Sequence, residues 1–418
     1  MHQKNIRIKK AYALKEYIHK KNIRILEFQN RKEISMINIK DKNIKLKILI
    51  LIICGIIFCG LFYFANNKDG GVLRGDTSST QYVKAKVLSL LENNLEAGGN
   101  LEGVQVGNQK IEIEIKSGVH KGERTTITNQ VGILSNVIVS EGSNIVVRIN
   151  NKSNGSYDFS VYNYDRSGIL YGFIILFCLA LCAIGGKKGA KAMLGLIFTM
   201  VSVFFILLPL IMKGYDSPVI TMIIVALTTV VCLIILDGVN SKTISAILGT
   251  IIGVAFAGTM ALIVGKIIKV SGFNTNEAEY LVTIAGDNGL KIRGLLVSTI
   301  LISSLGAVMD VAMSIASSVN EVYHVNKKLG SKELFISGMN IGKDAMGTMA
   351  NTLILAFTGS SLNLLILIYS YGISFSQLIN TDLIAIEILQ GISGSLGIIF
   401  TVPIVAFISS KVVFKYKF

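Results

Sequence analysis

GLLVSTILISSLGAVMDVAMSIASS, residues 294–318, is an apolar run that is long enough to cross a bilayer and carries Asp310 in its interior. A polar linker follows. The next stretch is SGMNIGKDAMGTMANTLILAFTGSS, residues 337–361, in which Asp344 lies at the start of the next apolar run. A carboxylate at the centre of a membrane helix costs about 2.5–3.5 kcal/mol on insertion scales. We therefore expect each carboxylate to have a partner or a function.

The helical period places small and polar residues of three runs on one face each. At about 100° per residue, the first face holds Ser303, Gly306, Ala307, Asp310, Ser314 and Ser317. The second face holds Asp344, Gly347, Thr348, Asn351 and Thr358, and the third holds Glu387, Gln390, Gly391, Gly394 and Thr401. Because small residues permit close approach, we expect the three faces to turn towards one another and the larger apolar residues to face lipid.

These two runs and a third, LIAIEILQGISGSLGIIFTVPIVA at residues 383–406, resemble the conserved blocks of the YibE/F-like family of multispanning bacterial membrane proteins. The similarity extends over about Tyr82 to Phe414 and leaves out the segment before Met36. It implies an architecture of several membrane spans, and it implies no particular activity.

The composition indicates the same class of protein. The 418 residues are 51% hydrophobic and 16% charged, with a mean hydropathy of +0.59, which is typical of a polytopic membrane protein and disfavours a large soluble enzyme. The five cysteines all lie in apolar runs, so the exposed parts have no disulfide framework. We expect neither a cofactor nor a metal site, because His120 lies alone in a loop and no zinc-protease motif is present.

The amino-terminal segment, residues 1–45, is a basic leader. Residues 1–47 contain fourteen Lys and Arg against four acidic residues. One interpretation is a basic amphipathic helix on an anionic cytoplasmic lipid surface, and another is that translation starts at Met36. Binding to nucleic acid is disfavoured, because no recognition motif accompanies the charge.

We expect about eight transmembrane helices. An uncleaved anchor at residues 46–65 precedes residues 66–167, and residues 168–418 form a seven-helix bundle. The seven spans are Ile169 to Gly185, Met193 to Met212, Val219 to Leu236, Ile244 to Gly265, Leu295 to Ser318, Ala345 to Tyr371 and Leu383 to Ser409. The sequence TGSSLN, Thr358 to Asn363, either interrupts one long span or separates two short ones.

The lysine distribution predicts that both termini are cytoplasmic, in a multi-pass protein of the cell (plasma) membrane. Residues 66–167 are then extracytoplasmic. Alternating apolar residues, as in KIEIEIKSG at residues 110–118, predict about five strands in a small inserted β-barrel, for which an OB-like topology is one candidate. This domain either captures a ligand or caps the bundle.

Two functions remain for the whole chain. The first is a secondary transporter or permease with a polar path through Asp310, Asp344, Asn351 and Glu387, lined also by Ser314, Ser317 and Thr348. The second is a non-transporting scaffold or sensor whose β-domain binds an extracytoplasmic ligand or partner. The candidate partners are the bilayer, protons or small ions, and a second copy in a homo-oligomer.

An enzyme is not expected. The sequence GISG at residues 391–394 matches a motif of rhomboid-like intramembrane proteases, but none of the four histidines lies within a span to act as the base. Asp310 and Asp344 also lack the G-x-G-D sequence of aspartyl intramembrane proteases.

Overall fold

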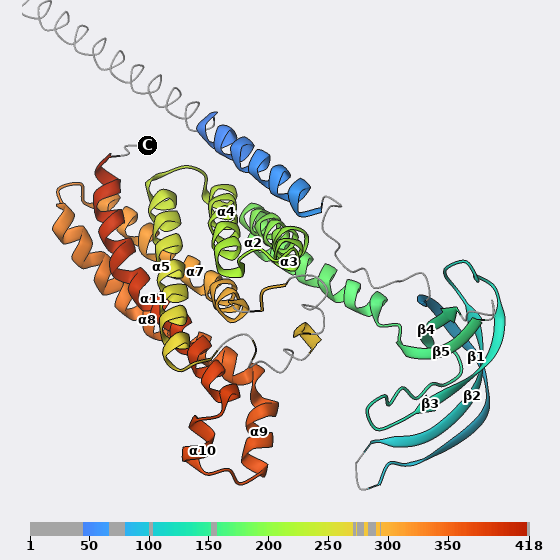
Figure 1. The fold of residues 1–418 in the computed structure, drawn as a ribbon. Coiled ribbons are helices and arrows are strands. Elements are labelled where there is room, and N and C mark those ends of the chain that lie inside the picture. Colours follow the sequence, from blue (N-terminus) through green and yellow to red (C-terminus); the bar gives the residue numbers. More distant parts are fainter. Residues whose placement is uncertain are drawn as a thin grey trace, which may run out of the picture. The chain divides into compact units, whose positions relative to one another are not determined.

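The computed structural model describes residues 45–66, 80–99, 103–151, 157–270, 273, 280–282, 290–292 and 294–415. The chain divides into two compact units, one of residues 72–186 and one of residues 1–71 with 187–418 (Figure 1). The predictions for the basic leader and for the alternative start at Met36 fall outside the described residues.

The first unit contains one curled antiparallel sheet (Figure 1). Its five strands are β1 (Thr80–Ala97), β2 (Gln105–Ile115), β3 (Arg124–Val131), β4 (Asn144–Asn151) and β5 (Tyr157–Tyr164), in the spatial order β3-β2-β1-β4-β5. The number of strands in the described residues confirms the prediction of about five. The sheet forms a half-barrel, and the OB-like topology stays a prediction.

The two-residue period of the strands decides which side chains form the core of the sheet. Ile111, Ile113 and Ile115 of β2 are fully buried, while the charged residues between them point away from the core. The buried amide of Gln109 binds the segment between β3 and β4, because its Oε1 accepts from the Val139 N–H at 3.0 Å and its Nε2 donates to the Val139 carbonyl at 3.0 Å. This segment therefore closes one side of the core.

An ion pair lies at the end of the sheet. The Lys84 ammonium is 3.0 Å from the Asp165 carboxylate, and the Ser167 hydroxyl donates to the same carboxylate at 2.6 Å. The hydroxyl of Ser167 and the ammonium of Lys84 together lower the pKa of Asp165 below its ordinary value. The carboxylate consequently stays ionised where the chain passes from the last strand to the following helix.

The remaining described elements are helical. They are the helix Lys45–Asn66, α2 (Ser167–Ser202), a π-helical turn (Val203–Leu207), α3 (Leu208–Met212), α4 (Ser217–Asp237), α5 (Ser241–Ile267), α7 (Leu295–Val325), α8 (Ser331–Ser360), α9 (Leu362–Ser370), α10 (Phe375–Ile379) and α11 (Asp382–Lys415).

Six helices in the described part of the chain are long and apolar enough to cross a membrane, or seven if α8 and α9 together count as one span. The predicted spans Ile169 to Gly185 and Met193 to Met212 both lie within the single helical stretch Ser167–Met212. Gly186 interrupts this stretch with a non-helical backbone conformation. The count of eight spans stays a prediction, because it depends on whether this stretch crosses the membrane once or twice.

The interruption expected at Thr358 to Asn363 is present. Helix α8 ends at Ser360, α9 begins at Leu362, and the two helices are bent by 60° at the break. Such a bend is found in broken spans and in re-entrant loops.

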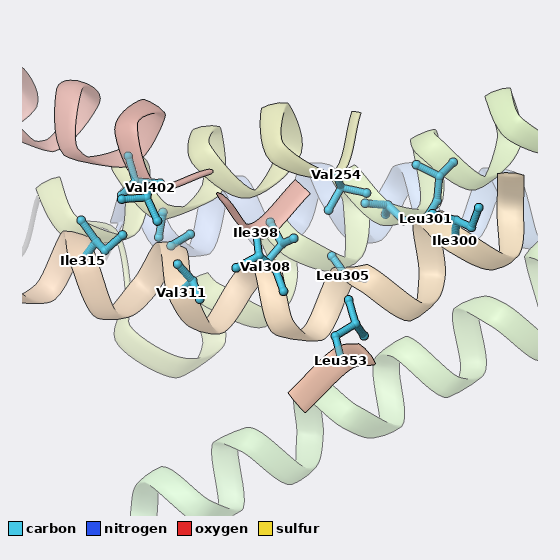
Figure 2. Packing of buried hydrophobic residues seen from close by; sticks show 14 of the residues in the cluster. Val254, Ile300, Leu301, Leu305, Val308, Val311, Ile315, Leu353, Ile398 and Val402 are labelled. Atoms are coloured by element: carbon cyan, nitrogen blue, oxygen red, sulfur yellow. The ribbon is translucent and has the colours of Figure 1, made fainter. Parts of the chain in front are cut away.

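The core of the helical unit lies where α5, α7, α8 and α11 meet (Figure 2). Helices α5 and α11 approach so closely that a Cβ atom at Gly253 would collide with the Thr401 hydroxyl, and one at Gly249 would collide with Val405. The small residues Ser245, Gly249, Gly253 and Ala257 of α5 are all buried, as expected for a helix-packing ridge. Ile300, Val308 and Ile315 of α7 fill the adjacent space and are fully buried.

We expect Gly253→Ala to destabilise the full-length protein by about 1–3 kcal/mol, because the added methyl group meets Thr401 at a contact that cannot open easily. Gly306→Ala on α7 is the matched control, because nothing lies within 4 Å of its Cβ position and alanine is the better helix former. Thermal unfolding in one detergent measures both variants. Equal stability of the two variants would contradict this packing.

Candidate functional site

Helix α7 has one packed side and one open side. The packed side consists of large apolar residues, among them Leu301, Leu305 and Val308, which lie in the core of the bundle (Figure 2). On the open side, Gly306, Asp310 and Ser314 are exposed, and Ser303 and Ser317 are half-buried. Asp310 therefore projects away from the core of this unit.

This arrangement differs from the expected one. The polar face of α7 was expected to turn inwards and its large apolar residues to face lipid, whereas the structure buries the apolar residues. The physical reason is the shape of the neighbouring helices. Gly342 of α8 leaves a space next to Ile315, and Gly258 of α5 leaves one next to Leu301, so that branched side chains of α7 fit against glycines.

Helix α8 repeats the pattern. Its buried positions, Leu334, Gly338, Gly342 and Leu353, pack on α7 and α11. Its exposed positions include every residue of the predicted polar face, namely Asp344, Gly347, Thr348, Asn351 and Thr358. We refer to the exposed and half-buried small and polar residues of α7 and α8, from Ser303 to Ser317 and from Asp344 to Thr358, as the open polar faces.

The predicted face of α11 lies inside the bundle instead. Gly394 is buried next to Leu353 of α8 and Ser304 of α7, and Thr401 is buried against α5. Glu387 is half-buried, and one of its carboxylate oxygens is shielded without a hydrogen-bond partner. The structure thus brings the α11 face against the buried sides of α7 and α8, rather than against their open polar faces.

Hydrogen bonds do not tie the open polar faces to other helices in the described part of the chain. Asp310 and Asp344 have no hydrogen bond or ion pair there. The Thr348 hydroxyl donates to the Ala345 carbonyl of its own helix at 3.0 Å, and the Thr358 hydroxyl donates to Ile354 in the same way at 2.9 Å. The carboxylates therefore remain available to water or to an ion.

The described residues contain no group of three His, Cys, Asp or Glu side chains that could hold a metal ion. The two carboxylates of the open polar faces also come from different helices and have no third ligand beside them. The chemistry that these residues offer is the exchange of protons and the coordination of water.

Sequence reasoning found the residues of both open polar faces but missed the side to which they point. A signal was present in the positions of the glycines. Gly249 and Gly253 of α5 and Gly338 and Gly342 of α8 recur at four-residue intervals, and such ridges accept large side chains from a neighbouring helix. In the structure, Val405 and Thr401 of α11 lie closest to the two α5 glycines, and Val319 and Ile315 of α7 pack against the two α8 glycines.

Comparisons with known proteins bear on the same part of the chain. A family model described as YibE/F-like protein matches residues 173–415, which include all of the helices that form the site. No curated protein and no solved structure matches the chain.

We expect a cysteine at Ser314 to react with a membrane-impermeant thiol reagent, because water must reach the open polar face of α7. The test uses a variant without the five native cysteines, assembled in lipid vesicles. Ile252→Cys in α5 is the control, because this apolar side chain is 44% exposed and we expect lipid to cover it. Protection of Ser314→Cys to the same degree as Ile252→Cys would contradict a water-lined face.

Proposed function

The chain belongs to the YibE/F-like family, and we propose that it is a secondary transporter or permease of the cell membrane. Its polar path follows the open polar faces of α7 and α8, with Asp310 as the central group. The energy comes from a proton or ion gradient, because no nucleotide-binding motif is present in the sequence.

One observation carries this proposal. Asp310 is exposed halfway along a helix that is long and apolar enough to span a membrane, and it has no partner among the described residues. A carboxylate and several hydroxyls along such a helix would be unfavourable against hydrocarbon, and intramembrane acids of this kind usually mark ion or substrate pathways. Contact of the two open polar faces with water instead of hydrocarbon removes this cost.

The break between α8 and α9 supports the same function. Discontinuous helices in transporters expose backbone carbonyl and N–H groups to a cavity, where these groups bind ions or substrates. Here the 60° bend lies between Ser360 and Leu362, in the turn that follows Thr358, the last residue of the open polar face of α8. The path and the break are therefore continuous along one helix.

We assign the roles along the path as follows. Asp310 binds and releases the transported proton, and Ser314 and Ser317 continue the polar surface along α7. Asp344 lies at the end of the path towards the predicted cytoplasmic side, with Thr348 and Asn351 between it and the break. Glu387 is left out of this path, because the predicted face of α11 lies inside the bundle and not on the open polar faces.

The orientation follows from the lysines, with both termini cytoplasmic and residues 66–167, which contain the five-stranded sheet, outside. The sheet unit then serves as a cap or as a site that captures ligand before transport. Protons or small ions are the cargo that the carboxylates fit best, since no larger binding pocket borders Asp310 among the described cavities.

We expect Asp310→Asn to reduce proton flux into vesicles loaded with a pH-sensitive dye by at least about tenfold, because the amide cannot exchange a proton at neutral pH. The side chain keeps its shape, so insertion and folding should be unaffected. Glu321→Gln, at an exposed position near the end of the same helix, is the matched control and should retain the flux.

Full flux in Asp310→Asn would contradict the path. Flux in the unmodified protein no greater than in protein-free vesicles would instead favour the scaffold or sensor, in which the sheet unit binds an extracytoplasmic ligand or partner.

A further inference from the structure

A large cavity lies at one end of the helical unit, apart from the open polar faces. Its volume is about 1140 Å³, and its walls come from the end of α5, the start of α4, and the start of α7 with the residues before it. The lining includes Lys266, Lys269 and Lys291, and the rest of it is mostly apolar. Neither the family match nor the proposed path assigns a role to it.

The three lysines are held together by the fold without being neutralised. Among the described residues, none of the three has a hydrogen bond or an ion pair. Asp216 is the acidic residue in the described wall, and its carboxylate accepts a hydrogen bond from the Val219 N–H at 3.2 Å. Three ammonium groups against one carboxylate give the described part of the wall an excess of two positive charges. Unpaired charges of one sign around a concave surface attract an ion of the opposite sign.

The backbone adds further donors. Gly294, Leu296 and Val297, at the start of α7, line the cavity, and no side chain caps this helix. The first N–H groups of a helix have no partner within the helix and favour anions. Gly294 has a φ of +99°, and a Cβ atom there would lie 2.8 Å from Pro218, so glycine permits the close approach of the starts of α4 and α7.

Two buried hydroxyls next to this wall have unused hydrogen-bonding capacity. Ser217 precedes the lining residue Pro218, and Ser298 follows the lining residue Val297. Both hydroxyls are buried without a hydrogen-bond partner. Buried polar groups are usually paired, so these two hydroxyls are unsatisfied groups directly behind the lining residues.

The apolar part of the cavity narrows the chemistry of the ligand. Leu262 and Ile263, on the membrane-spanning helix α5, line the same cavity and are about half exposed. An anion with an attached apolar chain could contact these residues and the lysines at the end of the helix at the same time. We propose that this cavity binds the phosphate group of an amphiphile, the chemistry of an anionic phospholipid. The inference does not depend on the proposed transport path.

The test measures lipid binding to the full-length protein in detergent by native mass spectrometry, with phosphatidylglycerol and phosphatidylcholine as probes. We expect preferential binding of phosphatidylglycerol. The triple variant Lys266→Gln, Lys269→Gln, Lys291→Gln should bind it about tenfold or more weakly, because each lysine near a membrane surface strengthens the attraction to anionic lipid.

The matched control is Lys187→Gln, Lys188→Gln, Lys332→Gln, which removes the same charge from exposed lysines that do not line the cavity. We expect a loss of less than about twofold there. A variant with arginine at positions 266, 269 and 291 keeps the charge and should retain binding, which separates loss of the site from misfolding.

Equal losses in the site and control variants would overturn the proposal, as would equal binding of the two lipids. A competition experiment, in which millimolar inorganic phosphate is added to the protein with bound phosphatidylglycerol, distinguishes a lipid phosphate from a soluble one. Displacement of phosphatidylglycerol by phosphate alone would overturn the amphiphile in favour of a soluble phosphate, whereas retention of the lipid supports it.

Discussion

The close approach of α5 and α11 is the constraint on which the helical unit depends. It is possible because Gly249 and Gly253 have no side chains, so that Val405 and Thr401 of α11 occupy the space where Cβ atoms would lie. In a bilayer the hydrophobic effect does not favour helix association, and dispersion contacts between closely packed backbones are the main source of stability. The tight helix pair therefore provides the surface on which α7 and α8 assemble.

The packing of α7 on that surface determines where the polar residues go. The branched residues Ile300, Val308 and Ile315 make the most contacts when they fit between α5, α8 and α11, and all three are fully buried. Since small and polar residues occupy the other side of the helix, Asp310 is left on the open side. The same packing that stabilises the bundle thus leaves a carboxylate and several hydroxyls on the open side of a helix that is long and apolar enough to cross a membrane.

The sequence predicts some parts of this structure well, for physical reasons. In a strand, successive side chains point to opposite faces, so the sequence alone decides which face turns towards the core. In KIEIEIK at residues 110–116 the isoleucines must be buried and the charged residues between them must be solvated. The break near Thr358 was also predictable, because a run of small polar residues interrupts the apolar residues on both sides.

The orientation of α7 was not predictable by the same reasoning. The interior of a membrane protein and the surrounding lipid are about equally apolar, so a helical period identifies two faces without deciding which one faces inwards. The complementary glycines on α5 and α8 contain that information, but they become informative only when the neighbouring helices are known. In the stretch Ser167–Met212, the non-helical backbone at Gly186 lies between the two predicted spans, directly after the predicted end of the first one at Gly185.

The most direct test of this account is a structure of the full-length protein in lipid nanodiscs by electron cryomicroscopy, at a resolution that shows ordered water and acyl chains. We predict that water or an unfilled aqueous groove borders Asp310 and Asn351 on the open polar faces. Continuous acyl-chain density along Gly306, Asp310 and Ser314 would contradict the polar path.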